Sequence, residues 1–379
     1  MTAAAAGTVV GRLVLDDRVA AGTITIEDGR IAAIALDREP AAPGPYISPG
    51  FVDVHVHGWG GHDAMGGRPA LDGMARRLLR RGVTSFLPTA VTAPLAELVA
   101  FAERVRAWLP DAPTDGAEPL GFNLEGPFLA MARRGAHDPA HLRVPADAPR
   151  ATIRQLVDGL RLITIAPELP GATDLIRWLR ERDVRISIGH SAATLEESAA
   201  GYEAGATSTT HLFNAMSGLD HRAPGVALAA LLDDTVYVEL IADGIHVHSA
   251  LWRLITRLKP TDRLVLVSDA IALAGTGDGR GRIGGLEVEV VGGRVTLVGT
   301  STLAGSVLAL DTAVRNVVAS GVGLPEAVAA ASRTPLAMLG VSDRGRLAAG
   351  QRADLVELDG DLAVRRVMRG GTWFAADAD

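Results

Sequence analysis

Short apolar runs alternate with amphipathic segments through the long middle of this 379-residue chain. Such alternation is typical of βα units, in which helices join parallel strands. The candidate strands are 51–57, 83–89, 120–125, 162–166, 184–190, 206–211, 236–242 and 264–269. Candidate helices between them include 71–81, 95–109, 150–160, 173–182 and 194–204. Eight strands joined by helices over roughly 250 residues predict an α/β fold, a TIM-like (β/α)8 barrel. An open doubly wound sheet is the alternative, disfavoured because no Gly-x-Gly-x-x-Gly motif follows an early strand.

The two ends of the chain differ from this middle. Both hold short strand-like runs separated by tight turns, such as Asp28-Gly29 near the start and Gly370-Gly371 near the end. We therefore expect a small β-sandwich domain built from both termini. The predicted domains are 1–48 with 345–379 for the small β domain and 49–344 for the barrel, with a β-hairpin insert near 279–299.

The first candidate strand ends in a His-x-His motif at His55 and His57. Side chains two residues apart on a strand share one face, so these two imidazoles can hold one metal ion. The alternative is a pair of histidines on a half-buried strand without a ligand. The metal interpretation requires further ligands from elsewhere in the chain.

Four other candidate strands also end in a histidine or a carboxylate. These residues are Glu125 on the third strand, His190 on the fifth, His211 on the sixth and Asp269 on the eighth. A lone histidine in such a place is more often a structural core residue. Active sites of (β/α)8 barrels lie at the C-terminal ends of the strands, so six residues at equivalent positions indicate one shared site.

The chemistry of these side chains favours a divalent metal of borderline softness. The chain has no cysteine, so the ligands are imidazole nitrogens and carboxylate oxygens. Zinc suits this set best, and iron or manganese would also fit. Glu125, His190 and His211 would give three ligands and leave a position for water. Asp269 would then act as general base and acid towards metal-bound water, which predicts a hydrolase.

The chain resembles the amidohydrolase superfamily in five motifs that run through nearly its whole length. They are Pro-Gly-Phe-Val-Asp-Val-His-Val-His, Asn-Leu-Glu-Gly-Pro-Phe, Gly-His-Ser, Thr-His-Leu-Phe-Asn-Ala-Met and Leu-Val-Ser-Asp-Ala. Within the superfamily they are similar to the family of N-acetylglucosamine-6-phosphate deacetylases. The resemblance implies hydrolysis of the acetamide of N-acetylglucosamine 6-phosphate to glucosamine 6-phosphate and acetate, usually by a homodimer.

The resemblance also implies roles for individual residues. Glu125, His190 and His211 match the metal ligands of the family, and Asp269 matches its acid/base. The implied substrate-binding residues are Ala136, His137, Asn214, Ala215, Arg222, His246, Leu303, Ala304 and Gly305. Among them, His137 would lie near the acetyl carbonyl, Arg222 would reach the phosphate in the neighbouring subunit's site, and 303–305 would close over the substrate.

A second metal ion at His55 and His57 is plausible, with Glu125 as the bridge. Binuclear relatives of other types use a carbamylated lysine, but Lys259 is the only lysine here and lies at a predicted helix end. The sequence therefore allows either one or two metal ions per subunit.

Composition excludes several other partners and leaves some alternatives. A net charge of -7 disfavours nucleic acid, and no apolar run is long enough for a membrane span. No basic segment precedes the apolar start, so we expect no signal peptide and a cytoplasmic location. The alternatives are another amidohydrolase (a deacetylase of a related amino-sugar phosphate, a deaminase or a cyclic amidase) and a non-catalytic barrel that serves as a scaffold.

Overall fold

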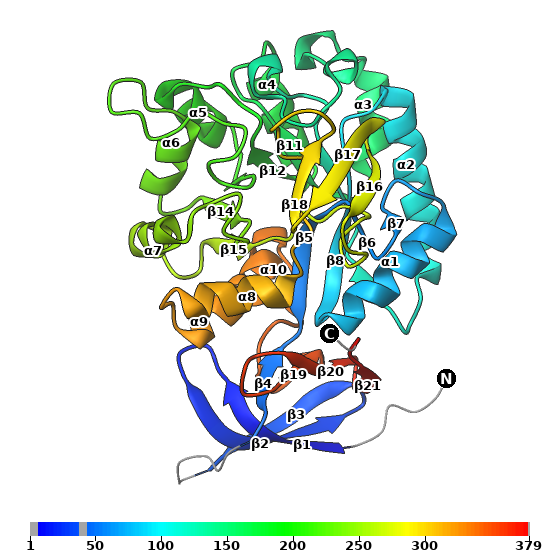
Figure 1. Cartoon of the computed structure of the whole chain (residues 1–379), viewed down its shortest axis with the longest axis vertical. Coiled ribbons are helices and arrows are strands. Elements are labelled where there is room, and N and C mark those ends of the chain that lie inside the picture. Colours follow the sequence, from blue (N-terminus) through cyan, green and yellow to red (C-terminus); the bar gives the residue numbers. More distant parts are fainter. Residues whose placement is uncertain (1–6, 38–43, 378–379) are drawn as a thin grey trace.

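The computed structural model describes residues 7–37 and 44–377, and its larger part is a nearly closed parallel barrel (Figure 1). Hydrogen-bonded neighbours follow chain order around the barrel, which confirms the predicted fold class. The barrel strands are β5 (Phe51–Val56), β8 (Val83–Ala90), β10 (Phe122–Glu125), β11 (Leu160–Ile165), β12 (Arg185–Ile188), β13 (Ser208–Thr209), β14 (Tyr237–Leu240) and β15 (Leu264–Leu266). A short strand, β9 (Glu118–Pro119), also pairs with β8.

Helices cover the outside of the barrel and connect its strands (Figure 1). They are α1 (Arg68–Arg80), α2 (Leu95–Trp108), α3 (Arg150–Val157), α4 (Ala172–Arg180), α5 (Leu195–Glu203), α6 (Val226–Leu232), α7 (Ser249–Leu258), α8 (Leu310–Ala319), α9 (Leu324–Ala330) and α10 (Arg333–Leu339). Local sequence fixes some of their ends. Helix α5 begins at a capping box, in which Thr194 and Glu197 bond to each other's backbone N–H groups. None of the helices in the described ranges is long and apolar enough to cross a membrane.

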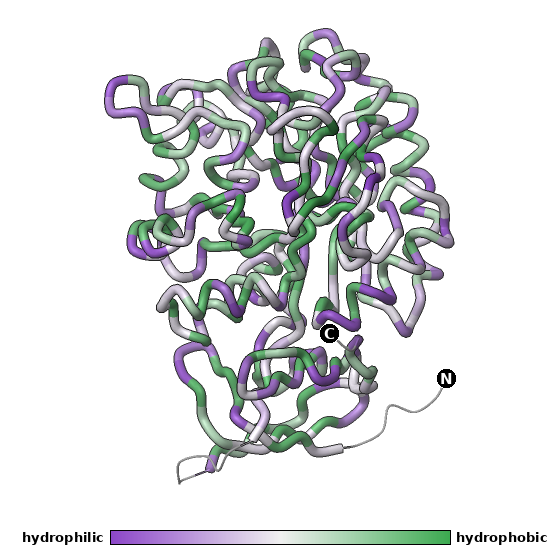
Figure 2. The backbone as a smooth tube through the Cα atoms, in the orientation of Figure 1, coloured by the Kyte–Doolittle hydropathy of each residue, from purple (hydrophilic) through white to green (hydrophobic). Residues whose placement is uncertain are grey.

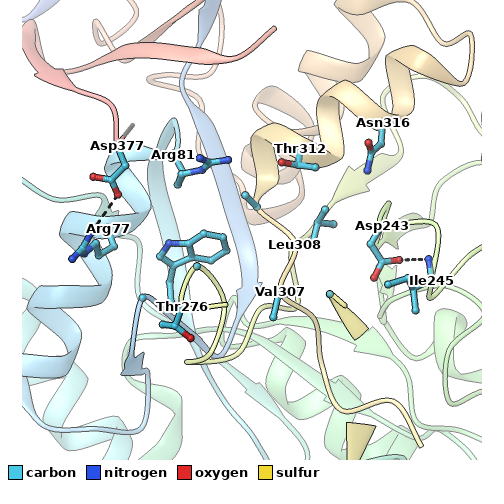
Figure 3. Close-up of a pocket in the computed structure, with 15 residues that line it drawn as sticks. Arg77, Arg81, Asp243, Ile245, Thr276, Val307, Leu308, Thr312, Asn316 and Asp377 are labelled. Atoms are coloured by element: carbon cyan, nitrogen blue, oxygen red, sulfur yellow. Dashed lines mark hydrogen bonds and ion pairs between the residues drawn. The ribbon is translucent and has the colours of Figure 1, made fainter. Parts of the chain in front are cut away.

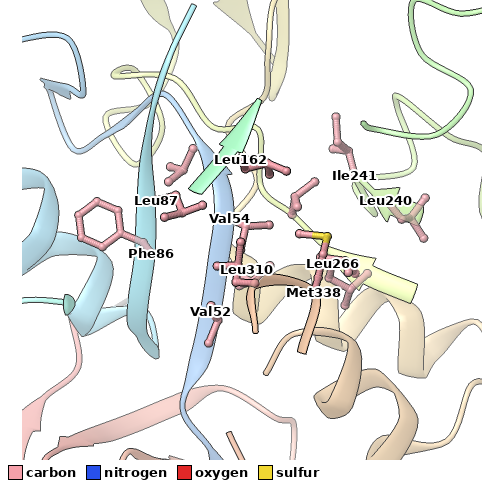
Figure 4. Packing of buried hydrophobic residues seen from close by; sticks show 14 of the residues in the cluster. Val52, Val54, Phe86, Leu87, Leu162, Leu240, Ile241, Leu266, Leu310 and Met338 are labelled. Atoms are coloured by element: carbon pink, nitrogen blue, oxygen red, sulfur yellow. The ribbon is translucent and has the colours of Figure 1, made fainter. Parts of the chain in front are cut away.

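Apolar packing between the strands and the outer helices forms the main core. Val52 and Val54 of β5 are at most 1% exposed, and they lie beside Leu310 of α8 and Met338 of α10 (Figure 4). Full burial of one such side chain contributes about 1.5–3 kcal/mol. In Figure 2 the central strands are mostly hydrophobic, whereas hydrophilic residues gather on outer helices and turns. The barrel is therefore a rigid support for groups at its strand ends.

A seven-stranded mixed sheet from both termini packs below the barrel (Figure 1). Its order is β21-β20-β19-β4-β1-β2-β3, which confirms that both termini build one β part, while the domain bounds of 1–48 with 345–379 and 49–344 stay a prediction. The bounds are β1 (Gly7–Val14), β2 (Val19–Glu27), β3 (Arg30–Leu36), β4 (Tyr46–Pro49), β19 (Leu355–Leu358), β20 (Val364–Arg369) and β21 (Thr372–Ala375). Asp28 and Gly29, with φ of 49° and 73°, make the tight turn between β2 and β3.

The segment 279–299, where a hairpin is expected, holds three antiparallel strands. They are β16 (Gly279–Ile283), β17 (Leu286–Val291) and β18 (Arg294–Leu297). A two-stranded ribbon, β6 (Gly58–Trp59) with β7 (His62–Asp63), follows the first barrel strand. Ala304 and Val288, both 0% exposed, belong to the small apolar cluster of the three-stranded insert, which packs against the barrel mouth.

Candidate active site

The six strand-end residues predicted from the sequence lie together inside the barrel mouth. Each follows or ends its strand as expected, and none is more than 6% exposed. They are His55, His57, Glu125, His190, His211 and Asp269.

Three of these residues have a left-handed backbone. The φ angles are 48° for His190, 28° for His211 and 52° for Asp269. Non-glycine residues rarely adopt this region, and strained backbone of this kind gathers at functional sites. At these turns the side chains of His190 and His211 contact Glu125, and the side chain of Asp269 contacts His57.

Glu125 is the centre of the cluster. Its Oε1 lies 3.0 Å from Nε2 of His190 and 2.9 Å from Nε2 of His211. Its Oε2 lies 3.2 Å from Nε2 of His57 and 3.3 Å from Nε2 of His137. One carboxylate thus faces four imidazoles directly.

Two overlapping groups of side chains have the spacing of a metal site, with one ligand atom from each residue within 4.8 Å of the others. The groups are His55, His57, Glu125 and Asp269, and Glu125, His137 and His190. Glu125 belongs to both groups, whereas His211 belongs to neither, although its Nε2 lies 2.9 Å from Glu125.

Hydrogen bonds on the far ring nitrogen fix the tautomers of two histidines. Nδ1 of His57 lies 3.1 Å from the carbonyl oxygen of Thr89, and Nδ1 of His190 lies 2.8 Å from that of Arg133. A carbonyl only accepts, so both Nδ1 atoms carry the proton. Nε2, which faces Glu125, is therefore the atom of each ring that can bind a cation, and on His57 the cation must displace a proton there.

His137 has the opposite tautomer. Its Nδ1 accepts a hydrogen bond from the backbone N–H of Thr92 at 3.3 Å, so the proton lies on Nε2. That N–H group faces Glu125. In this arrangement His137 is a hydrogen-bond donor rather than a metal ligand.

Asp269 lies beside the first-strand histidines. Its Oδ1 is 3.2 Å from Nε2 of His57 and 3.6 Å from Nε2 of His55. Burial raises the pKa of Asp269, but its hydrogen bond to His57 and the charges of His57 and His55 outweigh this and lower it below the usual range. Asp269 is therefore ionised and can accept a proton.

The carboxylates and imidazoles shift each other's pKa strongly. Burial opposes the charge of Glu125, yet neighbouring His55 and His137 hold its pKa well below the usual range. Burial likewise opposes protonation of His57, but Asp269 and Glu125 raise its pKa to about 9. Burial and the charge of His137 lower the pKa of His190 to about 4. A site that binds protons this tightly at some nitrogens also has the charge to bind a cation.

The donor set fits a divalent metal. Nε2 of His55 is fully buried and has no hydrogen-bond partner among the described residues, although it lies 3.6 Å from Oε1 of Glu125. Imidazole and carboxylate together suit zinc, iron or manganese.

A cavity of about 340 Å³ opens onto this cluster. Several residues with an implied substrate role line it, namely Ala136, His137, Asn214, Ala215, His246, Leu303 and Gly305. Ala304 instead packs into the apolar cluster of the insert. Arg222 lies on an exposed loop and does not line the cavity within this chain.

A second, larger cavity of about 740 Å³ shares no lining residue with the first (Figure 3). Arg77 and Asp377 pair on one side of it, with 3.6 Å between Nη1 and Oδ2, and Asp243 lies on the other side. Asp243 also bonds Nδ1 of His246, which lines the smaller cavity, at 2.7 Å. The larger cavity lacks the histidine cluster, so the smaller one is the candidate active site.

Sequence reasoning missed Glu239 and Asp53. Glu239 on β14 lies 3.2 Å from Nδ1 of His55, and Asp53 on β5 accepts hydrogen bonds from the backbone N–H groups of His55 and Ser268. Both are 0% exposed, and burial raises the pKa of Asp53 to about 6. The available signal was a single acidic residue inside each apolar strand.

The chain belongs to the amidohydrolase family, whose sequence profile it matches over residues 46–374. The N-acetylgalactosamine-6-phosphate deacetylase of Escherichia coli O157:H7 is 41% identical over 357 residues, covering 91% of this chain and 92% of that protein. The N-acetylglucosamine-6-phosphate deacetylase of Bos taurus is 40% identical over 376 residues, 93% of this chain and 88% of that protein.

Solved structures agree with these relatives. The N-acetylglucosamine-6-phosphate deacetylase of Thermotoga maritima superposes with a TM-score of 0.90 at 34% identity, covering 97% of this chain and 100% of that one. The Mycobacterium smegmatis enzyme, solved as an aspartate-to-alanine mutant in complex with N-acetyl-D-glucosamine-6-phosphate, gives 0.88 at 36% identity and covers 97% and 99%. The predicted membership of this family is confirmed.

Proposed function

We propose that this chain is a metal-dependent deacetylase that hydrolyses N-acetyl-D-glucosamine 6-phosphate to D-glucosamine 6-phosphate and acetate. The observation that carries the proposal is the convergence of Glu125, Asp269, His57, His190 and His211 in the lining of one cavity, with His55 beside Glu125. Relatives at 35–41% identity that cover about nine tenths of the chain support deacetylation over the deaminase, cyclic-amidase and scaffold alternatives.

Glu125, His190 and His211 would hold the primary ion. His55 and His57 would hold a second ion with Glu125 as the bridge, because one oxygen of Glu125 lies 3.0 Å from His190 and 2.9 Å from His211, and the other lies 3.2 Å from His57. Zinc is the first candidate, then iron or manganese. A divalent ion supplies Lewis-acid polarisation of the amide carbonyl and lowers the pKa of water.

Asp269 would act as general base and then general acid. Its lowered pKa keeps it ionised at neutral pH, so it can take the proton of the attacking water. The same proton then passes to the amine that leaves as glucosamine 6-phosphate. His137, whose proton lies on Nε2, would donate a hydrogen bond to the acetyl oxygen where negative charge develops.

The phosphate would be bound by Arg222 of a second subunit. The Arg222 guanidinium lies on an exposed loop and makes no ion pair within the described residues. A phosphate dianion favours the planar fork of arginine. A homodimer is therefore part of the proposal. A cytoplasmic location is also part of the proposal.

N-acetylgalactosamine 6-phosphate is a second candidate substrate. It is favoured by the Escherichia coli relative, which is named for that activity and shares 41% identity. The two sugars differ in the orientation of one hydroxyl group.

Acetate release from a panel of substrates tests both candidates. The panel holds the 6-phosphates of N-acetylglucosamine, N-acetylgalactosamine and N-acetylmannosamine, plus unphosphorylated N-acetylglucosamine, with Zn²⁺-, Fe²⁺- or Mn²⁺-loaded protein. We expect the highest kcat/KM for N-acetylglucosamine 6-phosphate. No acetate from any phosphorylated sugar with any of these metals would contradict the proposed function.

A further inference from the structure

Glu239 is a fully buried carboxylate that the proposed reaction does not use. It lies on β14 and is 0% exposed. Burial of a charged group costs several kcal/mol unless its contacts offset this, and an apolar residue often serves packing better. Yet Oε1 of Glu239 has no hydrogen-bond partner among the described residues. A carboxylate retained under these conditions points to a role other than packing.

The other oxygen of Glu239 contacts both halves of the candidate metal site. Oε2 lies 3.2 Å from Nδ1 of His55 and 3.2 Å from the backbone nitrogen of His211. The carbonyl oxygen of Glu239 also accepts a hydrogen bond from the N–H of Leu212 at 2.8 Å. Glu239 thus holds the ring of His55 and the left-handed turn at His211 at the same time.

We propose that Glu239 is a positioning residue that fixes the tautomer and ring orientation of His55 and so allows an ion to bind at His55 and His57. A carboxylate accepts the Nδ1–H of His55, which leaves the Nε2 lone pair free. That Nε2 lies 3.6 Å from an oxygen of Glu125 and 3.6 Å from an oxygen of Asp269. The inference rests on the proposed function only in requiring a metal, and on no particular substrate.

Competitive titration with Zn²⁺ and a chelator tests the role of Glu239 without any substrate. Glu239→Leu removes the acceptor at similar size, and Glu239→Gln keeps an acceptor oxygen. Asp53→Asn is the matched control, because Asp53 is equally buried but bonds the backbone N–H groups of His55 and Ser268 and not the ring of His55. The ion at His55 and His57 is identified as the one that His57→Ala lacks.

We expect Glu239→Leu to lower the affinity for this ion by about 10–100-fold, which is the usual effect of losing a residue that orients a metal ligand. Glu239→Gln should restore most of the affinity, and Asp53→Asn should leave it unchanged. The ion at Glu125, His190 and His211 should remain in all three variants. Unchanged affinity in Glu239→Leu, or an equal loss in Asp53→Asn, would overturn the inference.

If Glu239→Leu does not fold, the Zn²⁺-loaded wild-type chain still provides a test. Imidazole ¹H–¹⁵N spectra, assigned with His55→Gln, should show the proton of His55 on Nδ1, and a proton on Nε2 would overturn the inference. The outcomes separate this inference from the proposed function. If Zn²⁺ binding depends on Glu239 but the protein releases no acetate, only the proposed function is wrong. If the protein deacetylates its substrate but Zn²⁺ binding does not depend on Glu239, only the inference is wrong.

Discussion

The backbone N–H of Asp269 donates a hydrogen bond to the carbonyl of His55 at 2.9 Å. The proposed acid/base and a proposed metal ligand are thus joined through the main chain at the seam where the last barrel strand meets the first. The N–H of His57 adds a second bond across the seam, to the carbonyl of Ala270 at 2.8 Å. The hydrogen bonds that close the barrel therefore also hold Asp269 beside the first-strand histidines.

Asp269→Asn should lower turnover by about two to four orders of magnitude and leave metal content intact, because the variant loses a general base but keeps its backbone bonds. Asparagine also tolerates the left-handed backbone at this position. Metal analysis and acetate release on the same preparation measure both effects. Near-normal turnover of metal-replete Asp269→Asn would remove Asp269 from the mechanism.

Glu125→Ala should lose all tightly bound metal, whereas His57→Ala should lose at most one ion. The reason is that Glu125 contacts histidines of both proposed ligand sets, whereas His57 belongs to one set only. Elemental analysis after dialysis counts the ions per subunit. A His57→Ala protein with no metal at all would show that the division into two ions is wrong.

Metal binding should strengthen as pH rises from about 6.5 to about 9. In the metal-free chain, Asp269 and Glu125 overcome the effect of burial and raise the pKa of His57 from 6.5 to about 9, so a cation must displace a proton there. The same shift contributes stability to the metal-free fold, fully present below pH 6.5 and lost as pH rises through about 9.

Two measurements check this pH dependence. The Zn²⁺ dissociation constant is followed across the window, and the free energy of unfolding of the metal-free chain is compared with that of His57→Gln, so that other titrating groups cancel. A difference between the two proteins that does not change across the window would contradict the assignment.

Arg222→Ala should raise KM for N-acetylglucosamine 6-phosphate by roughly ten- to hundredfold. The reason is that a charge-assisted contact to phosphate contributes about 1.5–3 kcal/mol to binding. Unphosphorylated N-acetylglucosamine and metal content should be unaffected. Arg77→Ala is the matched control, because Arg77 is also exposed but lines the larger cavity. An equal loss on both sugars would defeat the phosphate role.

The role of Arg222 across a dimer interface needs a separate experiment. Mixed dimers of Arg222→Ala and Asp269→Asn subunits should regain activity, because one of their two sites then combines an intact Asp269 with an intact Arg222 from the partner. Verified heterodimers without any gain would place Arg222 in its own subunit's site, or in none.

The site's charged side chains could be predicted because they combine two independent signals. Each is a histidine or carboxylate, and each ends an apolar run that the barrel places at one rim. Their supporting contacts could not be predicted. His57 and His190 bond the carbonyl oxygens of Thr89 and Arg133. Because every residue has a backbone carbonyl, such partners cannot be recognised from residue types in the sequence.

Element lengths were harder to predict than element types. The sixth strand was expected over 206–211, but only β13 at Ser208–Thr209 pairs as a strand, because the chain turns left-handed at His211. Strand β16 escaped prediction since its sequence, Gly-Arg-Gly-Arg-Ile, lacks apolar alternation. In both cases tertiary geometry outweighs the local pattern.

The pairing of β4 with β19, in the register Tyr46 to Leu358, has a consequence for synthesis on the ribosome. β4 emerges early and leads directly into the barrel, whereas β19 is translated almost last. Until then one edge of β4 has no partner, and unpaired edges promote aggregation. A nascent chain that stalls before β19 therefore contains every proposed metal ligand, yet it should depend on chaperones to stay soluble.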